Sequence, residues 1–286
     1  MFYIPIIGSF FEAALAVIEK KILRKHNINS VNFTMYSFLS IIIVMLIPLY
    51  FFWELKPEAV MLTNLVIFIS IVIISVFANI TFAYSLKREN LSEMEPIRLM
   101  QPLFILLIAF SLSFFFSAYY EERNYPILIL SLIASLTLIL SHVNKSHLKM
   151  DKYIVAGIIG NFLFALEVVI SKSILPYYSS FTFYFLRSLF IFLICIVIWH
   201  PKIKPLKKGT RNLFFFMGIA AVVYRLIIYY GYQNIGIILT TILFLLSSVL
   251  IYLSAAIFLK ERIKKQQIIS SIVIIVCIIL SIIISQ

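Results

Sequence analysis

Apolar residues in this chain are grouped into ten long stretches that short polar segments separate. Each stretch is roughly 18 to 25 residues long, which is enough for an α-helix to cross a bilayer core of about 30 Å. The predicted spans are 3–23, 33–53, 62–86, 92–118, 125–143, 152–175, 179–199, 212–233, 236–259 and 267–285. Continuously apolar runs of this length exclude the alternating pattern of a membrane β-barrel. The pattern therefore predicts an all-α polytopic membrane protein with ten transmembrane helices.

The composition also indicates a lipid environment. Hydrophobic residues make up 63% of the 286 residues, and the mean hydropathy is +1.07. A soluble domain of this size needs a larger polar shell than the remaining residues provide. The first apolar run has no basic segment before it and continues through Leu23 with Glu12 and Glu19 inside it. We therefore expect this helix to be kept rather than cleaved as a signal peptide.

The formal net charge of +12 follows from where the cations lie. The odd-numbered loops between the spans hold most of the lysines and arginines, in clusters such as 20–25 and 202–211. The opposite face holds only Lys56, Arg123 and Lys172. By the positive-inside rule the basic loops are cytoplasmic, and ten helices then put both termini outside. We interpret the charge as membrane topology and contact with anionic lipid headgroups, not as nucleic-acid binding.

Few residues offer the chemistry of an enzyme. Cys195 and Cys277 lie within spans, and the four histidines lie at span ends or in loops. Asp151 is the only aspartate, whereas an intramembrane aspartyl protease needs two. The sequence contains no His-Glu-x-x-His motif and no glycine-rich phosphate loop. We predict no enzymatic activity, no catalytic residue, no metal site and no cofactor.

Short matches between the two halves indicate an internal repeat. The matching pairs are 33–36 with 181–184, 20–23 with 172–175, and Gly8 with Gly160. They predict a first five-helix repeat over 1–144, a linker over 145–152 and a second repeat over 153–286. Because each repeat has an odd number of helices, the two copies have opposite orientations in the membrane. Secondary transporters with inverted repeats bind their substrates near the midplane, where the halves meet.

Two motifs add a family resemblance to the ten-helix pattern. Pro102 is followed by Leu103 in the fourth span, and the ninth span ends in Phe258-Leu259-Lys260-Glu261-Arg262. In these features the chain resembles the drug/metabolite transporter superfamily, in particular its EamA-type members, which have a Gly where Lys260 stands. The resemblance covers nearly the whole chain and implies a transporter of two five-helix repeats. Many members are similar in having both termini inside, in contrast to the orientation that the charges predict here.

Ionisable residues within the spans are the main candidate site residues, because a charge at bilayer depth normally faces a partner or a wet cavity. Glu12 and Glu167 lie near the middle of equivalent helices in the two halves, so we expect both to face a central cavity. A carboxyl group removed from water binds protons more readily, which makes both candidates for carrying a coupling proton. Glu19 is on the same helix face as Glu12 but adjoins Lys20, and we expect it to form a salt bridge at headgroup level.

Arginine supplies the candidate cations. Arg225 lies near the middle of the eighth span, with Tyr229 one turn further on. Its guanidinium could bind a substrate carboxylate or phosphate, or could neutralise a glutamate as a structural pair. Arg98 and Gln101 lie in the polar, proline-containing segment 92–102, which we expect to be kinked and to line a cavity. Alternatively, this segment enters from the interface and Arg98 reaches back to the headgroups.

Three further polar residues within spans are candidates for hydrogen bonding in the cavity. They are Asn79, Tyr36 and Tyr184, and the two tyrosines are equivalent positions of the repeat. Each could instead serve packing between helices.

We hypothesise that the chain is a secondary transporter or facilitator of a small polar metabolite, working by alternating access around a midplane cavity. Carboxylates and a guanidinium together favour an amino acid-like zwitterion. We expect a monomer or homodimer in the cell membrane, with a small-molecule substrate and membrane lipids as partners. The alternative is a non-transporting or flippase-type protein for lipid-linked substrates, and a channel is a third possibility.

Overall fold

The structure is a computed structural model that describes residues 2–26, 28–88, 97–142, 152–201, 205–259 and 265–285. The α-helices are α1 (Tyr3–His26), α2 (Ser30–Phe52), α3 (Leu62–Arg88), α5 (Met100–Ser113), α6 (Tyr125–His142), α7 (Lys152–Ile174), α8 (Ser180–Trp199), α9 (Lys208–Asn234), α10 (Ile237–Phe244), α11 (Leu246–Leu259) and α12 (Lys265–Ile284). Three short 3₁₀ helices are η1 (Pro57–Val60), η2 (Ser117–Glu122) and η3 (Leu175–Tyr177). These ranges contain no strand beyond an isolated bridge between Leu55 and Tyr178. The predicted all-α class is confirmed.

Helix length supports a membrane protein with several spans. Within the described ranges, 6 helices are long and apolar enough to cross a bilayer, namely α2, α3, α7, α8, α9 and α12. The shorter apolar helices are α5, α6 and the stretch Ile237–Leu253, which includes α10. The chain is thus a multi-pass membrane protein.

The predicted fourth span, 92–118, differs from the helix found there. Residues 89–96 lie outside the described residues, and α5 ends at Ser113. Arg123 accounts for this end, because its Nε and Nη2 donate to the Ser113 carbonyl oxygen at 2.9 and 2.5 Å. A helix leaves its last carbonyls without internal partners, and a basic side chain can satisfy them.

The predicted ninth span, 236–259, is divided into α10 and α11 at Leu245. The Leu245 amide lies 3.2 Å from the Thr241 carbonyl oxygen and 3.1 Å from that of Ile242. The Ser248 amide then donates to the Leu245 carbonyl at 3.2 Å, so the backbone tightens to three-residue turns. No proline or glycine stands at this position, and the sequence pattern therefore gave no sign of the break.

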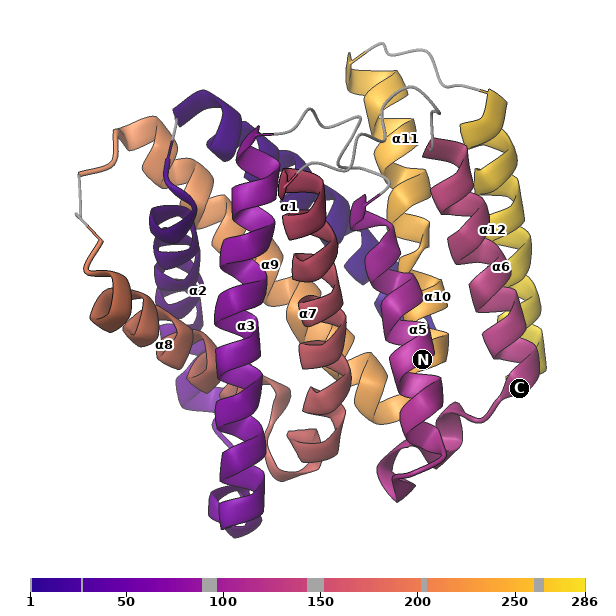
Figure 1. Cartoon of the computed structure of the whole chain (residues 1–286), viewed down its shortest axis with the longest axis horizontal. Coiled ribbons are helices and arrows are strands. Elements are labelled where there is room, and N and C mark those ends of the chain that lie inside the picture. Colours follow the sequence, from indigo (N-terminus) through magenta and orange to yellow (C-terminus); the bar gives the residue numbers. More distant parts are fainter. Residues whose placement is uncertain are drawn as a thin grey trace.

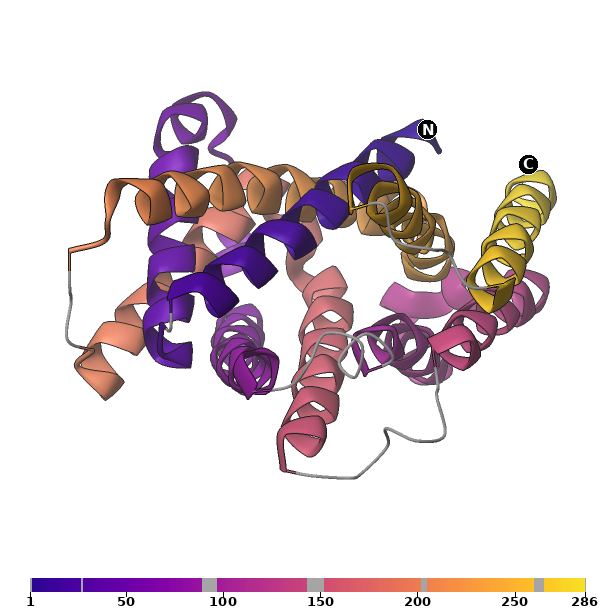
Figure 2. The same ribbon diagram turned by 90° about the horizontal axis from the view of Figure 1, so that it is seen from above.

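The helices pack in pairs that join the first part of the chain to the second. α3 lies along α7 and α1 along α9, while α2 packs against α8 and α6 against α12 (Figures 1 and 2). The C-terminal ends of α1, α3 and α6 lie at the top of Figure 1, which we call the basic-loop end. The connections 53–61, 114–124, 175–179 and 235–236 lie at the opposite end, which we call the even-loop end.

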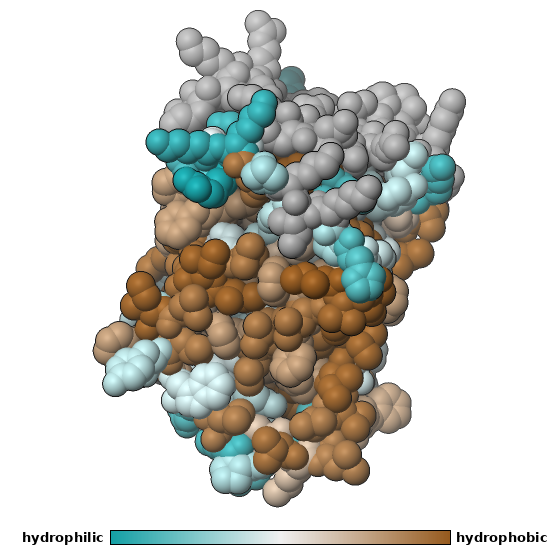
Figure 3. Space-filling view, turned by 90° about the vertical axis from the view of Figure 1, so that its left-hand side faces the viewer, coloured by the Kyte–Doolittle hydropathy of each residue, from teal (hydrophilic) through white to brown (hydrophobic). Residues whose placement is uncertain are grey.

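Large apolar side chains cover the outside of the bundle. Tyr50, Leu62 and Ile47 are 86%, 79% and 77% exposed, and many other apolar residues on the outer helices are nearly as open. Figure 3 shows a broad apolar surface of this kind on one side of the molecule. An apolar surface this extensive is costly in water and is stable against lipid tails.

Glycines allow the closest helix crossings. A Cβ at Gly160 of α7 would lie 3.0 Å from the backbone nitrogen of Phe82 in α3, and one at Gly8 of α1 would lie 2.8 Å from Ile227 in α9. A Cβ at Gly218 of α9 would overlap Ser40 Oγ and lie 3.0 Å from the Ser40 backbone in α2. Small residues let membrane helices approach closely, and packing at such crossings stabilises the bundle.

We predict that Gly218→Ala destabilises the protein, because the added methyl group meets the backbone of α2. Overpacking of this kind costs about 1–3 kcal/mol. Gly209→Ala is the matched control on the same helix, since no atom lies within 4 Å of its added Cβ. Thermal unfolding in detergent should show a lower melting temperature for the first variant only. Equal melting temperatures would mean that this crossing does not limit stability.

Candidate functional site

A cavity of about 170 Å³ lies at the centre of the bundle. That space holds on the order of ten water molecules or one small metabolite. Apolar side chains such as Phe82 and Phe164 form part of its wall. The polar lining residues are Glu12, Glu19, Ser37, Asn79, Arg98, Gln101, Tyr184, Arg187, Tyr224, Arg225, Tyr232, Thr241, Ser247 and Ser248. Residues from both halves of the chain therefore surround one polar space.

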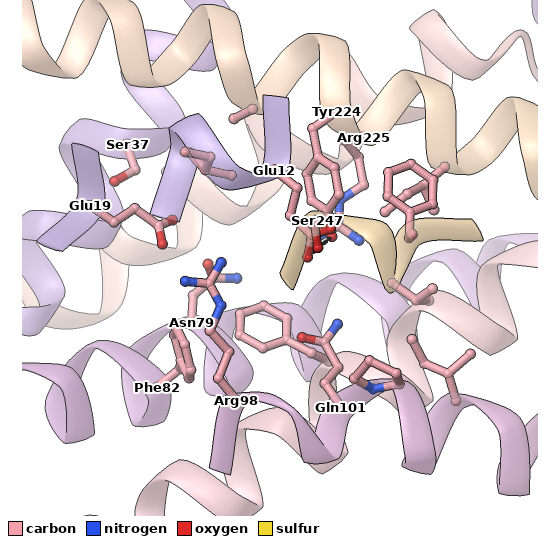
Figure 4. A pocket seen from close by; sticks show the side chains of 18 of the residues that line it. Glu12, Glu19, Ser37, Asn79, Phe82, Arg98, Gln101, Tyr224, Arg225 and Ser247 are labelled. Atoms are coloured by element: carbon pink, nitrogen blue, oxygen red, sulfur yellow. Dashed lines mark hydrogen bonds between the residues drawn. The ribbon is translucent and has the colours of Figure 1, made fainter. Parts of the chain in front are cut away.

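Glu12 of α1 is near the centre of this space. Figure 4 shows its carboxylate beside Arg225 of α9 and Ser247 of α11. The Tyr224 hydroxyl donates to Glu12 Oε1 at 3.4 Å. Glu12 Oε2 is buried, and among the described residues it has no hydrogen-bond partner. A carboxylate held this loosely can still accept a hydrogen bond or a proton from a ligand.

Glu19 lies two turns further along α1 and also lines the cavity. Figure 4 shows it on the same side as Glu12, with the Arg98 guanidinium extending toward it near Asn79. Its side chain is part of the cavity wall, because a spacing of seven residues repeats the same helix face. The salt bridge with Lys20 at headgroup level stays a prediction, since the Lys20 side chain lies outside what the structure describes.

Glu167 lies behind the cavity wall rather than on it. Its side chain is fully buried, with Arg187 Nη2 at 2.9 Å and Arg225 Nη1 at 3.8 Å from Oε2. Arg187 Nε also donates to Ser75 Oγ at 3.0 Å, which ties α8 to α3. At this turn of α7 the neighbouring Val168 faces the cavity, so Glu167 is placed as a counterion for the two guanidiniums.

The structure brings most of the other predicted site residues to the cavity. Those in its lining are Arg98, Gln101, Asn79, Tyr184 and Arg225. Tyr229 is fully buried, and its ring packs against Phe183 and Tyr184 with centroids 5.1 and 6.1 Å apart. Tyr36 instead packs against Phe214 at 5.6 Å, beside a separate groove between α2 and α9.

Several lining residues were not among the sequence candidates. They are Ser37, Arg187, Tyr224, Thr241, Ser247 and Ser248. Arg187 was visible as a charge within a span, and Tyr224 adjoins Arg225. The two serines enter the lining just after the break between α10 and α11, which no sequence signal marked.

The charges in and behind the wall balance. The described residues contribute three carboxylates, Glu12, Glu19 and Glu167, and three guanidiniums, Arg98, Arg187 and Arg225. Balance is expected at bilayer depth, where an uncompensated charge is costly. Among the described residues no group of three or more His, Cys, Asp or Glu could hold a metal ion. The arrangement suits a ligand that carries both signs of charge.

Comparison with known proteins supports this picture. Residues 151–283 match the EamA-like transporter family. None of the curated proteins matches the chain. Among solved structures 27 chains match, and the crystal structure of one protein has a TM-score of 0.73 over 99% of this chain and 96% of that chain, at 12% identity. Identity this low shows a shared fold and nothing more.

The family match covers just under half of the chain, and the shared fold extends over almost all of it. EamA-like proteins are transporters rather than enzymes, which agrees with a charged cavity inside a bundle of membrane-length helices. Over residues 151–283 the chain is therefore similar to the EamA-like transporters of the drug/metabolite transporter superfamily, which carry small molecules across membranes.

Proposed function

We propose that the chain is a secondary transporter or facilitator that moves a small polar metabolite, most favourably an amino acid-like zwitterion, by alternating access around the central cavity. The observation that carries this proposal is a single cavity lined by Glu12, Arg98 and Arg225. These side chains come from α1, the segment that leads into α5, and α9, so both halves of the chain contribute to one charged site.

Helix pairing supports the inverted repeat that this mechanism needs. In the predicted ten-helix arrangement α10 and α11 together form one span. The repeat then makes α1 equivalent to α7, and α3 equivalent to α9. The observed packing of α1 against α9 in one place and of α7 against α3 in the other is therefore the same contact made twice. Gly8 and Gly160, which match in the sequence, lie at these two crossings. We infer two inverted repeats, 1–144 and 153–286, joined by 145–152.

The site chemistry supports a zwitterion. Arg225 or Arg98 would bind the substrate carboxylate, as a guanidinium does well. Glu12 would accept hydrogen bonds from the ammonium, using the oxygen that has no hydrogen-bond partner among the described residues. Phe82, Phe164 and Phe244 give the cavity apolar surface for the rest of the molecule.

The charge pattern supports a location and an orientation. We propose a cell-membrane protein, monomeric or homodimeric, surrounded by lipid. The basic-loop end faces the cytoplasm, and both termini are then outside. A reporter enzyme fused to the C-terminus would be active outside the cell under this orientation.

We predict that an amino acid raises the melting temperature of the purified protein. The screen covers amino acids, organic acids, sugars, nucleotide sugars, polyamines and lipid-linked precursors. A ligand at a hundred times its dissociation constant stabilises by about 2.7 kcal/mol. Arg225→Gln should lose the shift, because it removes a charged contact in the cavity. Arg211→Gln, an exposed arginine on the same helix, should keep it.

Two outcomes of this screen would contradict the zwitterion proposal. One is stabilisation by lipid-linked precursors alone, which would favour the flippase-type alternative. The other is a shift of equal size in the parent protein, the Arg225 variant and the Arg211 variant, which would place the ligand away from the cavity.

We predict different effects for the two candidate coupling carboxylates. Glu12→Gln should abolish the acceleration of uptake by an imposed proton gradient and weaken substrate binding, because Glu12 faces the cavity. Exchange of substrate should continue at saturating concentration, since the Gln amide oxygen still accepts a hydrogen bond. Glu167→Gln should mainly lower thermal stability, by about 3–5 kcal/mol, since it leaves buried guanidiniums without their counterion. Gradient-driven uptake in proteoliposomes and thermal unfolding separate the two. Uptake that still follows the proton gradient after both substitutions together would exclude proton coupling through either residue.

A further inference from the structure

Glu122 ties the two halves together at the even-loop end. It lies in η2, which follows α5, and its side chain is 2% exposed. Its Oε1 accepts a hydrogen bond from the Ile237 amide at 2.6 Å, and its Oε2 accepts one from the Ile238 amide at 2.9 Å. Ile237 and Ile238 begin α10, so Glu122 satisfies two amides that a helix start leaves without internal partners.

The same carboxylate is paired with a buried lysine. Lys172 Nζ, near the end of α7, donates to Glu122 Oε1 at 2.6 Å, and the lysine side chain is 8% exposed. The more exposed Glu121 contacts the same ammonium. We call Glu122, Lys172 and the two α10 amides the Glu122 cluster.

The cap of α10 comes from far away in the chain. An N-cap side chain normally belongs to the residue just before the helix. That position is Gly236, which has no side chain and a positive φ of 94°. Glu122 supplies the missing group from 115 residues away, in the other half. The start of α10 is therefore complete only while η2 rests against it.

Tyr119 strengthens the contact of η2 with α7. Its hydroxyl donates to the Val169 carbonyl oxygen at 2.9 Å, one turn before Lys172. Burial raises the pKa of Tyr119 to about 12. The hydroxyl thus keeps its proton at physiological pH and remains a donor.

The Glu122 cluster lies one helical turn from the cavity lining, on the side of the even-loop end. Thr241, which lines the cavity, is one turn into α10 from the capped amides, and its Oγ1 donates to the Ile237 carbonyl oxygen at 2.7 Å. Toward the other side, the cavity is lined by Glu19, Phe33 and Arg98. These three residues lie near the helix ends that face the basic-loop end. The cavity thus extends toward the basic-loop end, and the cluster lies beyond it on the side of the even-loop end.

We propose that the Glu122 cluster is the gate of the transport path at the even-loop end, closed in this structure and opened when η2 separates from α7 and α10. This inference rests on the proposed transport function. A buried ion pair adds little net stability compared with apolar packing, so its use here fits a contact that must break and re-form. On opening, water can satisfy the carboxylate, the ammonium and the α10 amides.

The test measures access to the cavity from each face of the membrane. A reporter thiol is introduced by Thr241→Cys in a background carrying Cys195→Ala and Cys277→Ala, and is labelled in sealed vesicles with a charged, membrane-impermeant methanethiosulfonate. We expect ready labelling from the basic-loop face and slow labelling from the even-loop face. Lys172→Met should speed the slow reaction about tenfold or more, because loss of one partner shifts the closed population.

Lys56→Met is the matched control, since Lys56 also joins the halves at the even-loop end through a bond to the Pro176 carbonyl oxygen at 2.9 Å, but is exposed. It should leave both labelling rates unchanged. If Lys172→Met labels from the even-loop face no faster than the parent, or if both lysine variants speed it equally, the gate is overturned.

A second variant covers the case in which Lys172→Met does not fold. Glu122→Cys combined with Lys172→Cys, oxidised to a disulfide, should suppress labelling of the Thr241→Cys thiol from the even-loop face. For this variant the reagent is a charged, membrane-impermeant maleimide, and labelling is read from the peptide that contains position 241. Reduction of the disulfide, with the reductant removed before the maleimide is added, should restore the labelling. A labelling rate from the even-loop face that is the same with and without the disulfide would contradict the gate proposal and leave the transport proposal intact. A reporter that reacts from neither face in any variant would overturn the proposed transport path, and the gate with it.

Discussion

Compensation of charge at bilayer depth is the constraint on which the rest of this structure depends. Glu167 is fully buried among α7, α8 and α9, with Arg187 at 2.9 Å and Arg225 at 3.8 Å. Any one of these charges alone would cost several kcal/mol in the membrane. Because Glu167 partly neutralises Arg225 from behind, the guanidinium can stay at the cavity wall and still attract an anionic group. The charged site at the cavity wall therefore depends on the buried counterion behind it.

Close helix crossings hold the charged residues in position. Glu12 sits one turn from Gly8, where α1 passes within contact of Ile227 and Phe244. Gly160 plays the same part for α7 against α3. The break at Leu245 then brings Ser247 beside the Glu12 carboxylate (Figure 4). Packing between the halves thus sets the shape of the cavity, and the contacts around Glu122 join the halves at the even-loop end.

The sequence predicted the helical membrane class, the family and most of the charged residues at the cavity, because long apolar runs and charges within them are strong local signals. It did not distinguish Glu12 from Glu167. Both lie mid-span, and which one faces the cavity depends on the rotation of each helix against its neighbours. The place of Glu19 in the cavity wall follows from its spacing of seven residues from Glu12, which repeats one helix face. The break at Leu245 and the contact of Glu122 with α10 depend on tertiary structure, for which no local pattern exists.

The most direct test of a central substrate path is counterflow in proteoliposomes. Vesicles are loaded with the unlabelled compound that stabilises the protein, and entry of the labelled compound is followed from outside. A carrier with one cavity exposed alternately to each face predicts transient accumulation of label above equilibrium, and loss of this accumulation in Arg225→Gln. Equilibration without overshoot would indicate a channel. The absence of any protein-dependent entry would contradict transport through this cavity.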